Sequence, residues 1–132
     1  MKALLSIKPQ FVEKIFSGEK RFEYRKCIFA NKNITTIVVY ATMPIGKIVG
    51  EFRVDEILEN NPSDLWIETC PFSGIEKTFY DAYFEGKSKA FAIKIKDVQI
   101  YDEPINPYMK REKFTPPQSF CYLKSSHCFY NE

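Results

Sequence analysis

Hydrophobic and polar residues alternate over several short stretches of this 132-residue chain, a pattern typical of β-strands. Residues 47–57 place Ile48, Phe52 and Val54 on one face and mostly charged side chains on the other. The β-branched run 34–41 has little polar character and predicts a central, buried strand. The pattern predicts six strands, over residues 2–7, 19–27, 34–41, 47–57, 89–101 and 114–123.

Two or three helices are expected between these strands. Pro9 suits the first turn of a helix and Gly18 suits its end. The apolar stripe between them consists of Phe11, Val12, Ile15 and Phe16. A second helix is expected to begin near Asn61, and a third at the capping-box pattern of Ser73 and Glu76. The inner stripe expected for the third helix is Ile75, Phe79, Ala82 and Tyr83.

Consecutive short strands of this kind favour an α+β fold: a small, curled, mostly antiparallel sheet that closes into a barrel, with helices packed on it. The alternation shifts near Asp97, which predicts a bulge or bend in the fifth strand. A chain of this length is expected to form one domain. We assign that domain to residues 1–123 and expect residues 124–132 to form a loose C-terminal tail.

Composition narrows the class of protein. With 45% hydrophobic and 16% aromatic residues, the sequence is that of a globular domain. No apolar run approaches the roughly 20 residues of a membrane span, and the first residues do not resemble a signal peptide, so a cytoplasmic protein is expected. The four cysteines are scattered and His127 is the only histidine, so neither a metal site nor a cofactor is expected.

Charge is distributed unevenly although the net charge is only +2. Residues 1–40 carry eight basic and three acidic side chains, whereas residues 51–85 carry two basic and nine acidic ones. Residues 86–113 are basic again, with a net charge of +3. This asymmetry permits a site for a polyanion, and it is equally compatible with an ordinary mixed surface.

The strongest candidate for chemistry is the predicted strand 19–27, which directly follows the first helix. Its alternation places Arg21, Glu23 and Arg25 together on the face opposite its aromatic residues. Two guanidinium groups flanking a carboxylate suit a polar or anionic ligand. The same pattern also fits the solvated face of an edge strand, or ion pairs that stabilise a cleft wall.

The sequence G-x-K-x-x-E-x-R at residues 18–25, after a short amphipathic helix, resembles the signature of the ASCH domain (activating signal cointegrator homology), a branch of the PUA-like β-barrels. Further blocks resemble the small bacterial and phage-type members, at residues 5–9 (LSIKP), 40–47 (YATMPIGK), 73–75 (SGI) and 116–123 (PPQSFCYL). The resemblance covers residues 2–123. It implies a cleft between barrel and helices, lined by the signature strand.

The resemblance implies a module that binds RNA or a modified nucleotide as its partner. Lys20, Arg21 and Arg25 would meet phosphate or a base edge, and Glu23 would accept a hydrogen bond from an exocyclic amine. Tyrosines near the cleft could stack on bases, or could simply belong to the core. The candidate ligand-binding residues are Lys20, Arg21, Glu23, Tyr24, Arg25, Tyr40, Thr42 and Lys47.

Whether the protein is an enzyme stays open at this point. In small members that hydrolyse the acyl group of N4-acetylcytidine, a lysine acts with a threonine and a glutamate. Lys20 matches that lysine, Glu23 stands at the position of the threonine, and Glu68 is a candidate acid in the second helix. The alternatives to a binding module are therefore an amidohydrolase acting on an acylated cytidine-type nucleoside and a ribonuclease. A further alternative is a regulatory module that reads a small anionic metabolite or contacts an unknown protein partner through the acidic helices.

Overall fold

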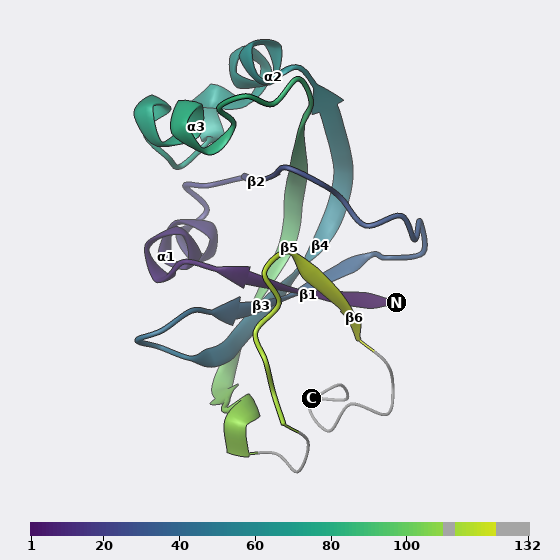
Figure 1. The fold of residues 1–132 in the computed structure, drawn as a ribbon. Coiled ribbons are helices and arrows are strands. Elements are labelled where there is room, and N and C mark those ends of the chain that lie inside the picture. Colours follow the sequence, from purple (N-terminus) through teal and green to yellow (C-terminus); the bar gives the residue numbers. More distant parts are fainter. Residues whose placement is uncertain (110–112, 124–132) are drawn as a thin grey trace.

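The structure is a computed structural model that describes residues 1–109 and 113–123 (Figure 1). It has the expected α+β architecture, and the described part contains six strands. These are β1 (Lys2–Ile7), β2 (Phe22–Arg25), β3 (Thr36–Ala41), β4 (Lys47–Asn60), β5 (Ala90–Ile105) and β6 (Phe120–Leu123). The helices are α1 (Pro9–Ser17), α2 (Pro62–Thr69) and α3 (Lys77–Tyr83), with 3₁₀ turns η1 (Cys70–Phe72) and η2 (Pro107–Met109). The tail expected at 124–132 lies outside the described residues.

The strands form one mixed sheet in the order β2-β5-β4-β3-β1-β6. β1 and β3 are parallel, and the other neighbouring pairs are antiparallel. The mostly antiparallel sheet is therefore confirmed. Among the described residues no ladder joins β2 to β6, so the strand pairings define a six-stranded sheet and not the closed barrel that was expected.

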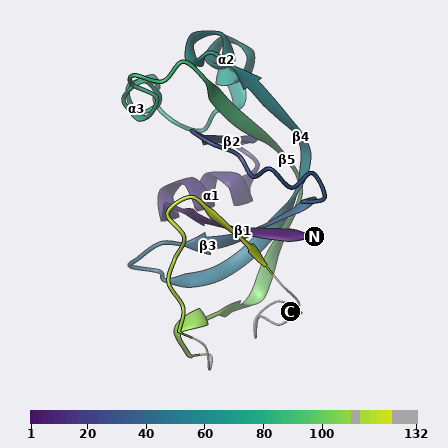
Figure 2. The ribbon, with the colours of Figure 1, turned by 45° about the vertical axis from the view of Figure 1, so that its right-hand side comes forward.

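β4 and β5 are the long strands of the sheet and extend upward to α2 and α3 (Figures 1 and 2). Their pairing shifts register where Glu51 and Arg53 face Gln99 and Lys96, which leaves one more residue on β5 than on β4. Asp97 lies in this bulge with a φ of 50°. The bulge predicted near Asp97 is thus confirmed, and such irregularities increase the bend and twist of a strand pair.

The first helix follows its sequence pattern. Val12 and Ile15 of α1 are buried in the largest hydrophobic cluster, and Phe11 and Phe16 pack against it. Gly18 ends the helix with a φ of 84°, the left-handed conformation that glycine adopts without a side-chain penalty. The other buried members of this cluster come mainly from β1 and β3, so α1 lies on the parallel strand pair. No helix among the described residues is long and apolar enough to cross a membrane.

The second helix also begins as predicted, but the third does not. The Asn61 side chain accepts a hydrogen bond from the backbone N–H of Asp64 at 2.9 Å, which caps α2. The capping box proposed at Ser73 and Glu76 is wrong, because α3 begins at Lys77 and Glu76 makes no side-chain cap. Ser73 is buried next to the signature strand instead.

This later start changes the face that α3 turns toward the core. Tyr80 is 1% exposed whereas Phe79, expected inside, is 37% exposed. The Tyr80 hydroxyl donates to the Pro62 carbonyl at 2.7 Å, which ties α3 to α2. Both helices then pack on β2 and β5 through a separate cluster of Phe22, Tyr24, Leu65, Tyr80, Phe84, Ala90 and Ala92.

Leu65 anchors α2 in that cluster, and the same helix offers a matched control. Leu65 is fully buried, whereas Ile67 is 71% exposed. We expect Leu65→Ala to lower the free energy of unfolding by about 3 kcal/mol, through lost burial and the cavity left behind. Ile67→Ala should change it by less than about 0.5 kcal/mol. Urea unfolding of both variants checks this, and equal effects would contradict the packing described.

Candidate ligand-binding site

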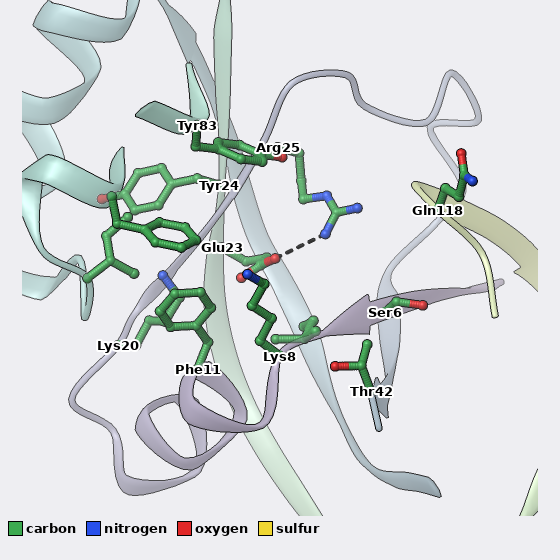
Figure 3. A pocket seen from close by; sticks show the side chains of 13 residues that line it. Ser6, Lys8, Phe11, Lys20, Glu23, Tyr24, Arg25, Thr42, Tyr83 and Gln118 are labelled. Carbon is green, nitrogen blue, oxygen red and sulfur yellow. Dashed lines mark hydrogen bonds and ion pairs between the residues drawn. The ribbon is translucent and has the colours of Figure 1, made fainter. Parts of the chain in front are cut away.

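A cavity of about 310 Å³ lies beside the signature strand, where α1, β2 and the segment around α3 meet the ends of β1 and β3 (Figure 3). It occupies the place of the cleft implied by the resemblance, between the sheet and its helices. Its walls come from segments far apart in the sequence. The lining residues are Ser6, Ile7, Lys8, Phe11, Lys20, Glu23, Tyr24, Arg25, Thr42, Ile75, Phe79, Tyr83 and Gln118.

Lys20 is the most deeply buried charged group of this wall, with an exposure of 2%. Its ammonium donates to the Ser73 carbonyl at 2.7 Å and lies 4.8 Å from the ring centroid of Tyr24. Burial lowers the pKa of Lys20 to about 8, since desolvation outweighs the nearby Glu23 carboxylate, which raises the pKa. The positive charge of Lys14 lowers this pKa further. An appreciable share of Lys20 is therefore neutral near pH 8.

Gly74 allows the chain to approach Lys20 this closely. Its φ is 66°, and a Cβ atom at this position would lie 2.4 Å from the Cβ of Lys20. A side chain would thus meet both backbone strain and a steric clash. The Ser73–Gly74 turn is packed directly on the Lys20 stem, which explains why this segment is not available to begin α3.

Glu23 and Arg25 point the same way from β2, as the strand alternation predicted. Arg25 Nη1 lies 3.2 Å from a Glu23 carboxylate oxygen, and the two side chains are only 12% and 8% exposed. The second terminal nitrogen of Arg25 donates to the Ser119 carbonyl at 2.7 Å. The planar guanidinium therefore links β2 to the segment that leads into β6, the two ends of the strand order.

Arg21 and Glu68 do not line this cavity. Arg21 precedes β2, so the strand alternation does not orient it; its guanidinium lies 4.4 Å from the ring centroid of Phe72. Glu68 is exposed and accepts a hydrogen bond from the Asn60 side chain at 2.8 Å. Both residues border a separate groove that Lys20 also touches. The structure thus separates Glu68 from Glu23 and Arg25.

The two candidate tyrosines are packed in the core. Tyr24 lines the cavity with its ring, but its hydroxyl is bonded to the Thr69 hydroxyl at 2.7 Å, and burial raises its pKa to about 12. Tyr40 is 1% exposed, belongs to a different cluster and shares a hydrogen bond with the Tyr108 hydroxyl. Burial raises the pKa of Tyr40 as well. Tyr40 therefore has no open face for stacking, and the Tyr24 ring can meet a ligand only where it borders the cavity.

Of the other two candidates from block 40–47, besides Tyr40, Thr42 reaches the cavity and Lys47 does not. The Thr42 N–H donates to the carbonyl of Ile7 at 3.1 Å, which holds it beside the end of β1. Lys47 begins β4, paired with Ala41, and is exposed. The sheet register therefore separates these two residues although they are close in sequence.

Several lining residues were not named as site residues from the sequence. Ser6, Lys8 and Gln118 lie within the blocks 5–9 and 116–123 that carried the resemblance, so that signal could have found them. Phe11, Phe79 and Tyr83 looked like core residues, since helical stripes usually face the core. Within the described residues no group of three or more His, Cys, Asp or Glu side chains is arranged to hold a metal ion.

Comparison with known proteins identifies the class to which this fold and cavity belong. The family model of the ASCH domain matches residues 5–99, which include α1, the signature strand and most of β5. The chain therefore belongs to the ASCH domain family, within the PUA-like superfamily.

Individual relatives agree with this assignment. The chain is 32% identical over 125 residues to an ASCH domain-containing ribonuclease of Zymomonas mobilis, covering 92% of this chain and 84% of that protein. The crystal structure of ASCH from Zymomonas mobilis superposes with a TM-score of 0.87 at 30% identity, over 96% of this chain and 90% of that one. The chain is also 33% identical over 122 residues to large ribosomal subunit protein uL22 of Ureaplasma parvum, but spans only 39% of that longer protein.

The lowered pKa of Lys20 has a measurable consequence for stability. Between pH 8 and 10.5 the unfolded chain binds a proton at Lys20 that the folded chain lacks, so the free energy of unfolding should rise with pH. We expect wild type to gain stability relative to Lys20→Met across this window, by at most about 1.4 kcal/mol per pH unit. Below the window the difference should be constant. Urea unfolding at each pH measures it, and parallel curves throughout would refute the lowered pKa.

Proposed function

We propose that this protein binds RNA by holding one unpaired nucleotide in the cavity beside the signature strand. That nucleotide is either unmodified or modified. The observation that carries the proposal is the buried Lys20, Glu23 and Arg25 set on one wall of a cavity of about 310 Å³ with aromatic rings on another. This volume is at the lower end of the range for small-molecule sites, about 300–1,000 Å³. It suits one base with part of its sugar better than a duplex.

The aromatic wall supplies the surface for a base. Phe11, Phe79 and Tyr83 line the cavity, and rings of this type recognise unpaired bases through their faces. Phe79 is 37% exposed, so its position is open to a ligand, unlike that of Tyr40. Phe11 and Phe79 already contact each other edge to face, with centroids 5.2 Å apart. They therefore form a preorganised apolar surface.

The charged wall supplies polarity and direction. The Glu23 carboxylate keeps oxygen lone pairs available beside Arg25 and can accept from a base N–H, as carboxylates do from an exocyclic amine. Arg25 contributes positive charge at the same point, which favours a phosphodiester nearby. Arg21 and Lys47 would act only on the longer strand outside the cavity, and Tyr24 would act through its ring.

The names of two relatives support RNA as the partner. One is named a ribonuclease and the other a large ribosomal subunit protein. The proposal also includes two finer expectations: that Arg25 and Ser119 help to close the sheet into a PUA-like barrel, and that the protein acts in the cytoplasm. The free thiols of Cys27, Cys70 and Cys121 are compatible with a reducing compartment.

Binding can be tested by fluorescence anisotropy with single-stranded RNA, duplex RNA and single-stranded DNA at two salt concentrations. We expect single-stranded RNA to bind most tightly. Arg25→Ala should weaken it about tenfold and reduce the slope of log K against log salt by about 0.7, the value for one phosphate contact on a single strand. An unchanged slope would remove Arg25 from the site.

Arg53→Ala is the matched control, because Arg53 is an exposed arginine on β4 outside the cavity. Arg25→Ala also leaves the buried Glu23 without its partner, so thermal unfolding must first show that the variant is folded. Absence of binding by wild type to any of the three nucleic acids would overturn the proposed function.

A ribonuclease is the second candidate function, favoured by the relative of that name and by the lowered pKa of Lys20. A neutral Lys20 amine could accept the proton of an RNA 2′-hydroxyl as its oxygen attacks the adjacent phosphorus and the 5′-oxygen leaves. Glu23 could assist the transfer of a proton from water to that leaving oxygen. An amidohydrolase would use the same lysine to activate water. Glu68 lies outside the cavity and would not take part.

The variant Lys20→Arg distinguishes the two enzyme mechanisms from a protein that only binds RNA. If Lys20 is the base, cleavage by wild type should rise with pH up to about 8 and the variant should lose at least about 100-fold in rate. RNA cleavage and release of acetate from N4-acetylcytidine are measured in parallel. Lys94→Arg is the control, because Lys94 is a half-exposed lysine on β5 that does not line the cavity. Turnover retained by Lys20→Arg would exclude both enzyme mechanisms through this residue.

A further inference from the structure

The polar groups of the cavity differ in whether they already have partners. Lys20 donates to the Ser73 carbonyl, and Arg25 bridges Glu23 and Ser119. The Ser6 hydroxyl is likewise taken, because it donates to the Pro117 carbonyl at 2.8 Å. These groups hold one another and the walls of the cavity in place. They would have to give up or share bonds to contact a ligand.

Three lining residues are not committed in this way. Within residues 1–109 and 113–123, the Thr42 hydroxyl and the Gln118 amide have no hydrogen-bond partner, and the Lys8 ammonium has no ion pair. Lys8 lies over the ring of Phe79, 5.1 Å from its centroid, and is otherwise exposed. The hydrogen-bonding capacity that the cavity can offer a ligand without rearrangement is therefore concentrated in Lys8, Thr42 and Gln118.

The sheet register brings these three residues to the same end of neighbouring strands. Ile7 pairs with Ala41 in the parallel pair of β1 and β3, so Lys8 and Thr42 are the next residues beyond that pair. β6 runs antiparallel to β1 with Phe120 opposite Leu5, which places residue 118 level with the end of β1. The bond from Ser6 to Pro117 fixes this segment there.

The polar end and the aromatic wall lie on different sides of the cavity. Figure 3 shows Ser6, Thr42 and Gln118 on one side, Phe11 and Tyr24 across from them, and Lys8 extending between. A nucleotide has the same division, since its base has an apolar face while its sugar and phosphate are polar. A base on the aromatic wall would direct its sugar toward the polar end.

We propose that Lys8, Thr42 and Gln118 form a ribose-phosphate subsite, in which Thr42 and Gln118 bond the 2′-hydroxyl and Lys8 meets the adjoining phosphate. This inference rests on the proposed function and adds to it a preference for RNA over DNA. A 2′-hydroxyl is both donor and acceptor, as are a threonine hydroxyl and a glutamine amide. A lysine ammonium suits phosphate as a flexible point charge. The subsite makes the cavity selective for RNA over DNA.

The experiment compares one single-stranded RNA with the DNA of the same base sequence, containing deoxyuridine in place of thymidine, so that only the 2′-hydroxyls differ. Dissociation constants are measured by anisotropy for the full chain. Wild type should bind the RNA about tenfold more tightly than the DNA, since one or two hydrogen bonds are lost with the hydroxyl. The combined Thr42→Val and Gln118→Leu variant should reduce that ratio to about one, because its affinity for RNA falls while its affinity for DNA does not.

Two further variants sharpen the test. Thr78→Val makes the same chemical change at an exposed position of α3 outside the cavity, and should keep the wild-type ratio. Lys8→Gln should keep the RNA-to-DNA ratio but weaken both ligands and reduce the salt slope by about 0.7. Thermal unfolding of each variant confirms that it is folded. If the combined variant does not fold, either Thr42→Val or Gln118→Leu alone can replace it.

The outcomes distinguish a failure of the ribose-phosphate subsite from a failure of the proposed RNA-binding function. If wild type binds RNA and DNA equally, or if the combined variant keeps the wild-type ratio, the ribose-phosphate subsite is overturned while nucleic-acid binding stands. If Lys8→Gln leaves the salt slope unchanged, the phosphate contact is overturned. If wild type binds neither strand, the proposed function fails and the subsite with it.

Discussion

The burial of Lys20 is the constraint on which the arrangement of the cavity depends. An ammonium group taken out of water is costly unless it is hydrogen-bonded and compensated. Here one carbonyl oxygen, from Ser73, accepts its hydrogen bond at 2.7 Å, while the ring of Tyr24 and the Glu23 carboxylate supply negative potential. Ser73 can serve in this way only because Gly74 allows the turn to press against the lysine stem.

This constraint extends to the helices above the sheet. Since the Ser73–Gly74 turn is held against β2, α3 begins only at Lys77, and its buried face carries Tyr80. Phe79 therefore lies beside the cavity and outside the core. There its ring lies under the Lys8 ammonium. The position of an aromatic wall residue on α3 thus follows from the hydrogen bond of a buried lysine that lies just before β2.

These relations also show how far the sequence could lead. Local pattern, by period-two alternation or by a β-branched run, was sufficient for the existence of six strands, although the last is only Phe120–Leu123 of the expected 114–123. It was also sufficient for the bulge at Asp97 and for the shared orientation of Glu23 and Arg25, because each depends on neighbours in the chain. The capping-box pattern misplaced α3, since a tertiary contact with Lys20 takes the segment that local preference would have made helical. Arg21 was grouped with the cavity because the predicted strand, residues 19–27, began three residues before the true start of β2 at Phe22.

The role of the last segment could not have been predicted from local pattern at all. Gln118 reaches the cavity because β6 pairs with β1, whose sequence is more than a hundred residues away, and because Arg25 binds the Ser119 carbonyl. Neither contact leaves a periodic trace in the sequence. Only the resemblance of residues 5–9 and 116–123 to family blocks pointed to both sides of this junction.

These contacts indicate that different residues of the cavity maintain its structure and select its ligand. The residues that make the signature recognisable satisfy one another: Lys20 is held by Ser73, and Arg25 is shared between Glu23 and Ser119. Their first effect is to build and preorganise a charged wall, whose groups must share or give up these bonds to contact a ligand directly. Selectivity among ligands therefore falls to side chains outside the signature that keep free hydrogen-bonding capacity. On this reasoning, chains that share the signature can accept different ligands, because exchanging a residue such as Thr42 or Gln118 changes what is recognised without disturbing the buried lysine.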